Sequence, residues 1–416
     1  MSNENKKDTK SMSVLLGAAF LMATSAIGPG FLTQTSKFTA QYLASFAFVI
    51  VCVVIMDVIA QTNVWSVIGA SGLRGQDIAN KMLPGLGVFL AVLVSIGGLA
   101  FNIGNVGGVS LGLNALAGIP EKVGIILAGA LAICIFLSRS GKTLMDKVAQ
   151  IMGAIILVVI LYVCITSRPP VGTAVMRVFT PENPKDLFAP MITLLGGSCG
   201  GYITFSGAHR LLDAGYGGEK DVAHFRKSVF TGVGVSATVR ILLFLAVLGV
   251  CTSGATVLTD VAETIIGASN PAAEAFRQAA GDIGYRLFGL ALFAAGTTSV
   301  IGAAYTSVSF LKTLNPFIMK NEKWFIVGFI AFSTLVMVLV GNPAEVLILV
   351  GALNGLILPI SLGIILIASR NRKIVGDYKH PIALIVLGVI VALAAAYLGG
   401  TTFVTNIQNF IKAISG

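Results

Sequence analysis

The sequence predicts an all-α integral membrane protein, on the evidence of its composition, the length of its apolar runs and the breaks within two of them. Hydrophobic residues make up 56% of the 416 residues and charged residues only 11%, whereas soluble proteins carry about 25% charged residues. The mean hydropathy is +0.90. Apolar runs of about 18 residues or more recur along the chain, which indicates membrane helices rather than barrel strands.

One membrane domain is expected over residues 13–400, between an N-terminal tail at 1–12 and a C-terminal tail at 401–416. About eleven segments are long enough to cross a hydrocarbon core of about 30 Å. In order they lie near 13–36, 42–66, 85–113, 122–138, 144–166, 187–212, 228–251, 282–311, 324–341, 343–368 and 381–400.

Lys and Arg gather in alternate loops, and this positive-inside bias orients the chain. It predicts a cytoplasmic N-terminus in the plasma membrane, and an odd number of spans then places the C-terminus outside. The same bias explains the net charge of +10 without a nucleic-acid partner. We therefore expect the partners of the chain to be the lipid bilayer and a small solute.

Two kinds of motif are missing from the sequence. No GxxxxGK[ST] nucleotide-binding motif occurs, which favours secondary transport over ATP-driven transport or enzymatic activity. No CxxC or metal-finger spacing occurs either, so free thiols are expected at the five single cysteines. We expect no metal site and no cofactor beyond a coupling ion, either Na⁺ or H⁺. The cysteines are Cys52, Cys134, Cys164, Cys199 and Cys251.

Glycine interrupts the first and the sixth predicted spans at their middles. The first break reads SAIGPGF over residues 25–31, and the second reads GGSCGGY over residues 196–202. A kink that eases helix packing explains either break taken alone. Breaks at matching positions in two halves of a membrane protein favour a transport site, because freed backbone groups survive in a membrane only where protein covers them or they line a cavity. Spans 1–5 and 6–10 are then expected to form inverted repeats.

The backbone at the first break suits either sign of charge. Pro and Gly make Gly28-Pro29-Gly30 a poor helix interior. Unwinding there exposes carbonyls that end one half-helix and amides that begin the next. Carbonyls suit cations, whereas amides at a positive helix end suit anions such as carboxylates.

Several stretches of the chain resemble the NRAMP divalent-metal transporters. Residues 16–21 (LGAAFL) and the break at 28–31 (GPGF) resemble the first helix of that family, where the break reads Asp-Pro-Gly-Asn. The resemblance continues in order at 75–79, 111–116, 118–120 and 287–296. It implies a LeuT-like fold, with two inverted five-helix repeats, broken helices 1 and 6 and an extra helix. It also implies secondary active transport by alternating access.

The ligands that this resemblance implies for a metal are replaced in this chain. The Asp and Asn of the first break fall on Gly28 and Phe31, and the Met-Pro-His of the sixth span falls on residues 200–202 (GGY). The acids of the third span, tied in the family to proton movement, fall on Asn102 and Asn105. A divalent cation needs oxygen or softer ligands that offset its charge. The chain is thus similar to a divergent branch with a different substrate.

We expect the substrate to be a small organic acid, an amino acid or a lactam such as 5-oxoproline, with its carboxylate at the half-helix amides. Hydroxyls would contact its polar groups and phenylalanines its organic body, unless they only fill a core. The alternatives are an Mn²⁺ or Mg²⁺ transporter with backbone-dominated coordination, and an uncoupled channel or sensor. The expected substrate-binding residues are Ile27, Gly28, Pro29, Gly30, Phe31, Cys199, Gly200, Gly201, Tyr202, Thr204, Phe205 and Ser206.

Other polar residues within the spans form an expected coupling or polar network. Arg240 either meets a substrate carboxylate or pairs with Asp57, and we favour the ion pair. The run 297–299 (TTS) resembles the hydroxyls that hold sodium in sodium-coupled members of this fold, although hydroxyls also bond to carbonyls of their own helix. The network comprises Asn102, Asn105, Thr297, Thr298, Ser299, Asp57 and Arg240.

Overall fold

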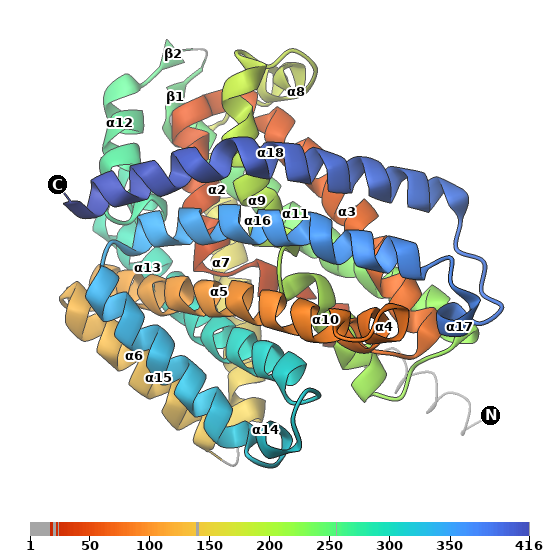
Figure 1. Cartoon of the computed structure of the whole chain (residues 1–416). Coiled ribbons are helices and arrows are strands. Elements are labelled where there is room, and N and C mark those ends of the chain that lie inside the picture. The colour runs from red at the N-terminus through yellow and green to blue at the C-terminus, as the bar shows by residue number, and fades with distance from the viewer. Residues whose placement is uncertain (1–16, 20–21, 24, 139–140, 255, 416) are drawn as a thin grey trace, which may run out of the picture.

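The structure is a computed structural model, in which we describe residues 17–19, 22–23, 25–138, 141–254 and 256–415, without the side chains of 141–150, 152–153, 156 and 403–415. Helices dominate these residues (Figure 1). The helices are α2 (Pro29–Tyr42), α3 (Phe46–Ser71), α4 (Gly75–Met82), α5 (Leu86–Ala117), α6 (Glu121–Leu137), α7 (Gly141–Ser167), α8 (Val171–Phe179), α9 (Phe188–Cys199), α10 (Ile203–Asp213), α11 (Val222–Val250), α12 (Thr259–Gly267), α13 (Pro271–Leu311), α14 (Pro316–Lys320), α15 (Glu322–Val340), α16 (Pro343–Ala368), α17 (Arg372–Val375) and α18 (Ile382–Ser415).

Short elements connect some of these helices. Three 3₁₀ turns cover Leu43–Ser45, Pro184–Leu187 and Glu219–Asp221. Two two-residue strands, β1 (Thr252–Ser253) and β2 (Thr256–Val257), pair antiparallel after α11. They lie beside α12 at the end of the molecule where α18 finishes (Figure 1).

The all-α membrane fold predicted from the sequence is confirmed. In the part of the chain that is described, eight helices are long and apolar enough to cross a membrane, or nine if the bent pair Leu157–Ser167 and Val171–Phe179 counts as one span. The stretch Pro29–Ser71 is a single one of these and contains both α2 and α3. Each of the eleven predicted segments coincides with helix, although residues 13–16, 20–21 and 24 of the first, like the N-terminal tail, lie outside the described residues.

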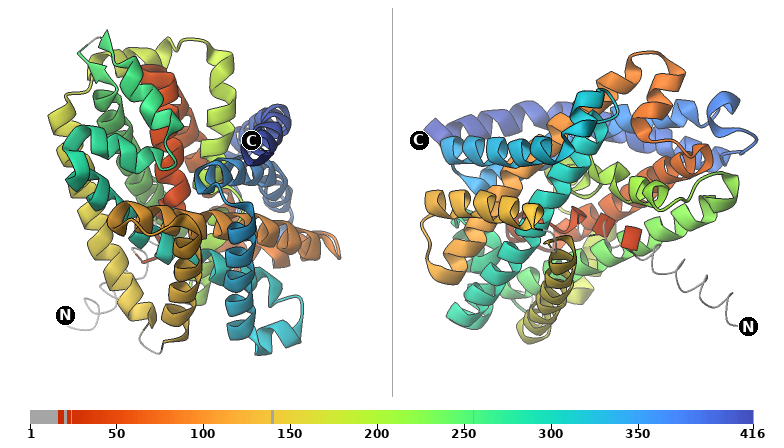
Figure 2. Two further views of the ribbon diagram at one scale, coloured as in Figure 1. Left: turned by 90° about the vertical axis from the view of Figure 1, so that its left-hand side faces the viewer. Right: turned by 90° about the horizontal axis from the view of Figure 1, so that it is seen from below.

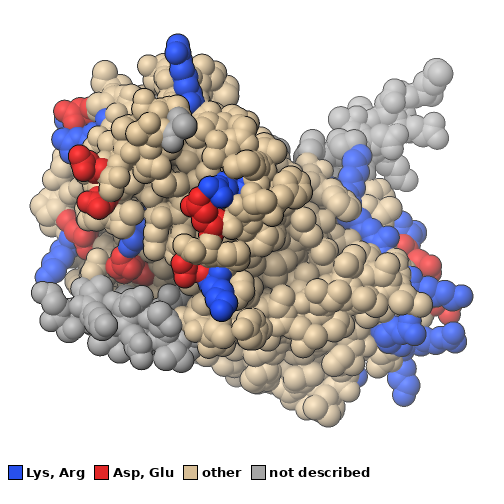
Figure 3. Space-filling view, turned by 90° about the horizontal axis from the view of Figure 1, so that it is seen from above, with Lys and Arg blue, Asp and Glu red and all other residues tan. Residues whose placement is uncertain are grey.

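Three of the long helices run in one general direction, and α6 and α15 slant across them (Figure 1). In Figure 1, α5, α16 and α18 run along the length of the molecule, and α18 packs on the outside of α16 (Figure 2). On the face drawn in Figure 3, charged side chains gather toward the two ends and leave a broad uncharged band between them. This band is the surface expected to meet lipid.

Glycine allows the two helices α5 and α13 to pack closely at the centre of the fold. A Cβ at Gly112 of α5 would lie 2.5 Å from the backbone nitrogen of Phe293, and one at Gly289 of α13 would lie 2.7 Å from Ala115 Cβ. Small residues allow this close approach, on which van der Waals attraction between membrane helices depends. Gly108 of α5 makes similar room for Pro29, so α5 also supports the first break.

This packing predicts different effects for two alanine substitutions on α13. Gly289→Ala should lower the stability of the detergent-solubilised protein by about 1–3 kcal/mol through overpacking. Gly302→Ala is the matched control, because nothing lies within 4 Å of a Cβ at Gly302. Thermal melting of both variants checks this, and equal melting temperatures would show that the α5–α13 crossing does not depend on Gly289.

Candidate functional site

Both predicted breaks are present in the backbone. The first helix bends at Ile27 and Gly28, and α2 begins at Pro29, whose missing N–H and fixed φ suit a first helical position. In the second break α9 ends at Cys199, Gly200 is extended and Gly201 has a φ of +55°. That left-handed conformation favours glycine.

The first break lies against polar side chains of α5 and α13. A Cβ at Gly28 would lie 3.4 Å from Asn105 Oδ1 and 3.1 Å from Ser299 Oγ. Ser299 Oγ is buried and has no hydrogen-bond partner among the described residues. Two predicted network residues are thus brought to the first break, and both offer neutral oxygen atoms there.

The second break lies against Asn354 of α16. A Cβ at Gly200 would lie 2.6 Å from the Asn354 carbonyl oxygen, and one at Gly201 would overlap the Asn354 side chain. The Asn354 amide donates to the carbonyls of Val350 and Gly97, at 3.0 and 3.2 Å. Space beside the two glycines is therefore occupied by Asn354, which joins the break to α5 and α16.

Gln34 holds α2 against α9 and α16. Its Nε2 donates to the Leu347 carbonyl at 2.7 Å, and its Oε1 has no hydrogen-bond partner in the described structure. A Cβ at Gly197 would lie 2.7 Å from this Oε1. The half-helices that follow the first break and precede the second are therefore in contact through an amide side chain.

Arg240 of α11 lies between the two broken helices. Its side chain is 2% exposed, and its Nη1 donates to Ser198 Oγ of α9 at 2.7 Å. Its guanidinium carbon lies 4.1 Å from the ring centroid of Phe31 in the first turn of α2. Its Nε and Nη2 have no hydrogen-bond partner among the described residues. The cluster thus has unused N–H donors that carry a positive charge.

Asp57 of α3 is the carboxylate whose charge acts on Arg240. Its carboxylate is 3% exposed and accepts a hydrogen bond from Gln61 Nε2 at 2.5 Å, and the Cys199 thiol also interacts with it. The salt bridges of the described residues do not include Asp57 with Arg240, so no N–O contact within 4.0 Å joins them. Their charges attract across a short gap instead of forming the direct ion pair that we favoured.

Three other predicted site residues have partners outside the two breaks. The Phe205 ring packs against His209 and Phe310, at 5.8 and 5.3 Å between centroids. The Thr297 and Thr298 hydroxyls donate to carbonyls of their own helix, at 2.7 and 2.9 Å. In this structure these three residues do not add atoms to the two breaks.

Four more predicted residues have hydrogen-bond or ring partners within the protein. Asn102 Nδ2 donates to Ser333 Oγ of α15 at 3.2 Å, and Ser206 Oγ donates to the Ile203 carbonyl at 3.1 Å. The Thr204 hydroxyl donates to the Cys199 carbonyl and so bridges the second break. The Tyr202 ring is buried edge-on against Phe101, with centroids 5.6 Å apart.

The comparisons with known proteins identify the family. A profile described as natural resistance-associated macrophage protein-like (Nramp) matches residues 19–405. The chain belongs to the Nramp family. The uncharacterized membrane protein YcsG of Bacillus subtilis is 52% identical over 401 residues, which cover 96% of each chain. An uncharacterized membrane protein of Haemophilus influenzae is 50% identical over 404 residues, which cover 97% of this chain and 99% of the relative.

Solved structures confirm the LeuT-like fold of this Nramp protein. The manganese transporter of Eremococcus coleocola matches 96% of this chain and 88% of its own, with a TM-score of 0.75 at 16% identity. MhsT in complex with L-phenylalanine matches 94% and 98%, with a TM-score of 0.61 at 13% identity. The family and the fold are those of secondary transporters in membranes.

Of the side chains that usually bind metals, the breaks in this Nramp protein contain only the Cys199 thiol among the described residues. Within the described ranges, no group of three or more His, Cys, Asp or Glu residues is placed to hold a metal ion. The atoms at the first break are carbonyl, amide and hydroxyl oxygens, and Arg240 adds a positive charge beside Phe31. Neutral oxygens suit a cation but do not offset a divalent charge, whereas the Arg240 guanidinium suits an anion.

Ion pairs lie on both sides of the breaks. Lys37 of α2 pairs with Glu345 at the start of α16, and Arg74 pairs with Asp213 at the end of α10. The first pair joins the half-helix after the first break to α16, and the second joins the half-helix after the second break to the α3–α4 connection. Neither half-helix is free to move without breaking its ion pair.

A buried histidine links the connection between α17 and α18 to α3. His380 Nε2 lies 2.8 Å from Asn63 Oδ1, and its Nδ1 lies 3.2 Å from the Tyr378 hydroxyl, to which Arg226 donates. Burial, helped by the Arg226 charge, lowers the pKa of His380 to about 4. The imidazole is therefore neutral at neutral pH and joins the α17–α18 connection to α3.

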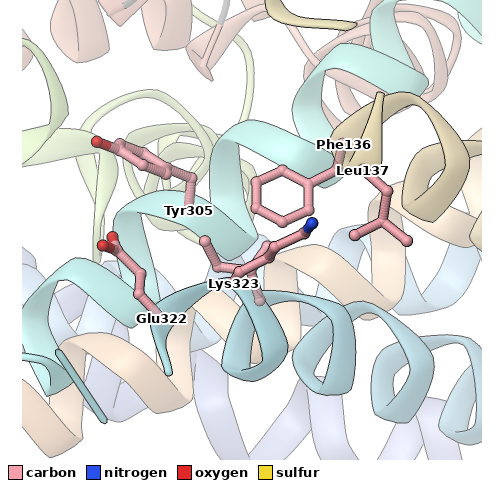
Figure 4. Close-up of a pocket in the computed structure, with 6 residues that line it drawn as sticks. Phe136, Leu137, Tyr305, Glu322 and Lys323 are labelled. Carbon is pink, nitrogen blue, oxygen red and sulfur yellow. The ribbon is translucent and has the colours of Figure 1, made fainter. Parts of the chain in front are cut away.

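A surface pocket of about 300 Å³ lies away from the breaks. Figure 4 shows it between the end of α6, with Phe136 and Leu137, and the start of α15, with Glu322 and Lys323; Tyr305 of α13 completes it. The Glu322 carboxylate already pairs with Lys312 at 2.9 Å. Of the two charged residues that line the pocket, Glu322 is therefore already paired.

The sequence analysis missed four residues that shape the site. These are Gln34, Gln61, Ser198 and Asn354, each buried. All four are uncharged polar residues within apolar spans, and this was the signal that could have found them. Asn354 is the one amide side chain in the apolar run 343–368, where an amide is costly unless it has partners.

The second break predicts a further pair of contrasting substitutions. Gly201→Ala should lower the melting temperature strongly and abolish transport, because the methyl group adds an overlap with Asn354 to the left-handed strain. Gly72→Ala has a similar φ of +65° but an open Cβ position, and should lose only the strain of about 1–2 kcal/mol. Melting and uptake assays on both variants separate the two effects. Equal losses would show that Asn354 does not constrain the break.

Proposed function

We propose that this Nramp-family protein is a secondary active transporter of a small organic carboxylate, which binds at the two breaks. A compound of the 5-oxoproline type, with one carboxylate and a compact polar body, suits the hydrogen-bonding groups there. The proposal places the protein in the plasma membrane with its N-terminus in the cytoplasm and its C-terminus outside, as the distribution of Lys and Arg predicts.

The observation that carries this proposal is the unsatisfied guanidinium of Arg240. A buried charge with unused donors is costly unless a partner arrives. Arginine presents a planar fork that matches a carboxylate through two parallel hydrogen bonds. With Nε and Nη2 both free of partners, Arg240 has the donors for such a bidentate contact.

The start of α2 supports the same ligand. Gly28 caps this helix without a side-chain hydrogen bond, and Pro29 has no N–H, so the Gly30 and Phe31 amides are the first donors at a positive helix end. The Arg240 guanidinium also packs over the Phe31 ring. The first amides of α2 and the Arg240 guanidinium therefore both lie at Phe31, which favours an anion next to this residue.

The similar solved structures suggest two different classes of substrate for this protein. The structure of MhsT holds L-phenylalanine, which itself carries a carboxylate. The Eremococcus coleocola neighbour is a manganese transporter, so a divalent cation held by backbone carbonyls, Asn105 and Ser299 is the second candidate. The positive charge of Arg240 opposes that cation, and we therefore favour the carboxylate.

Replacing Arg240 should selectively weaken carboxylate binding. Hydrogen bonds to charged groups contribute about 1.5–3 kcal/mol, so Arg240→Gln should weaken 5-oxoproline binding about tenfold or more. Arg277→Gln is the matched control, because Arg277 also lies over an aromatic ring, Tyr285, but is half exposed on α13. Calorimetry on folded protein and radiolabelled uptake in proteoliposomes measure both variants. Unchanged affinity in Arg240→Gln would contradict the proposed contact.

The metal candidate has a direct test in vesicles. Proteoliposomes containing the wild-type protein should take up no more Mn²⁺ than empty vesicles, because the breaks lack anionic ligands and Arg240 repels cations. A fluorescent metal indicator inside the vesicles reports the uptake. Saturable Mn²⁺ uptake would favour the second candidate, and a leak of ions without saturation would indicate an uncoupled channel.

A further inference from the structure

The described structure buries one carboxyl group and one guanidinium group. Among the buried polar side chains of the described residues, Asp57 is the sole carboxylate and Arg240 the sole Lys or Arg. The other ionisable groups there include His209 and His380. Isolated charges are very costly inside a membrane protein, so the two opposite charges must balance each other when no substrate is bound.

The two groups each meet one of two adjacent residues at the end of α9. Arg240 Nη1 donates to Ser198 Oγ, and the next residue, Cys199, interacts with Asp57. Cys199 is the last helical residue before the second break. The charge pair is therefore attached directly to one of the two broken helices, although its two members do not touch.

The surroundings of Asp57 contain few other ionisable groups. The groups that interact with its carboxylate are Gln61 on its own helix, Cys199 on α9 and Arg240 on α11. The described parts of α2, α4, α8, α10, α16, α17 and α18 and of the 3₁₀ turns Leu43–Ser45 and Glu219–Asp221, which also pack against α3, add no charged group to these interactions. The charge on Asp57 is therefore set mainly by what Arg240 faces.

A carboxylate that binds Arg240 changes this balance. The buried groups would then carry two negative charges and one positive charge, which leaves an uncompensated buried anion. A proton on Asp57 restores neutrality and leaves Arg240 paired with the substrate. We propose, resting on the function proposed above, that Asp57 carries the coupling proton, so that one proton and one monocarboxylate cross the membrane together.

The step balances in charge and in atoms. The proton comes from water on the side where the substrate enters, adds to an Asp57 carboxylate oxygen, and leaves to water on the other side as the substrate departs. The cotransported pair carries no net charge. Transport is then driven by a pH gradient and is insensitive to membrane potential.

Wild-type protein gives the first test, with 5-oxoproline as the probe. Calorimetry in buffers of different ionisation enthalpy should show about one proton taken up per molecule bound. The dissociation constant should then rise by up to about tenfold for each pH unit once Asp57 is ionised in the empty protein. Proton uptake near zero would overturn the proposal without any mutation.

The variant Asp57→Asn imitates a protonated carboxyl and should uncouple transport. Binding should become independent of pH and should tighten, because Arg240 no longer has a competing anion. Exchange of labelled for unlabelled 5-oxoproline should persist, whereas accumulation driven by a pH gradient should disappear and uptake should respond to membrane potential. Asp260→Asn, which changes an exposed acid on α12, is the matched control and should leave coupling intact.

The outcomes separate this inference from the proposed function. If the wild-type protein binds none of a panel of small carboxylates, the proposed function fails first. If it transports 5-oxoproline and Asp57→Asn still accumulates it with a pH gradient, the role of Asp57 is wrong while the function stands. If Asp57→Asn does not fold, Asp57→Glu and the wild-type proton count decide, because a glutamate at this position should shift the pH at which binding weakens.

Discussion

The structure depends on one constraint: backbone groups freed inside a membrane must be covered by protein. Both broken helices meet it through glycine. Gly108 lets α5 reach Pro29 at the first break, while Gly200 and Gly201 let Asn354 fill the space beside the second. An unpaired backbone group in lipid costs several kcal/mol, so the breaks persist only because these neighbours lie so close. The site is therefore built from backbone and amide groups, and its shape does not depend on acidic side chains at the breaks.

Buried charges, like buried backbone groups, must be compensated by neighbouring groups. The buried interior of the described structure holds one carboxylate and one guanidinium, both attached to the end of α9 by neutral partners. The two groups are too far apart to form a direct ion pair. Their charges still attract each other, because electrostatic attraction extends over several ångströms in a medium of low dielectric constant. A gap between two opposite buried charges gives an incoming anion something to bind without first breaking a salt bridge. It also makes the charge of Asp57 sensitive to the occupancy of Arg240.

Much of the fold could be predicted because its signals are local. Span length, the position of the breaks and the order of the helices all follow from short stretches such as residues 25–31 and 196–202. The partners of each residue could not be predicted, because they depend on contacts between segments far apart in the chain. Asn354 reaches Gly97, and Arg240 reaches Ser198. Phe205 and Thr298 were also predicted as site residues, but the Phe205 ring packs against His209 and Phe310, and the Thr298 hydroxyl donates to a carbonyl of its own helix.

Two ion pairs connect this buried chemistry to the ends of the molecule. Lys37 with Glu345 ties the half-helix α2 to α16, and Arg74 with Asp213 ties the half-helix α10 to the α3–α4 connection. Each pair is partly exposed, and pairs of that kind contribute little net stability. A pair that is cheap to break suits a segment that must move, since alternating access requires each half-helix to be released in turn. The costly charges stay at the centre of the fold, where in the proposed function their balance selects what binds, while weak pairs at its ends hold the half-helices between movements.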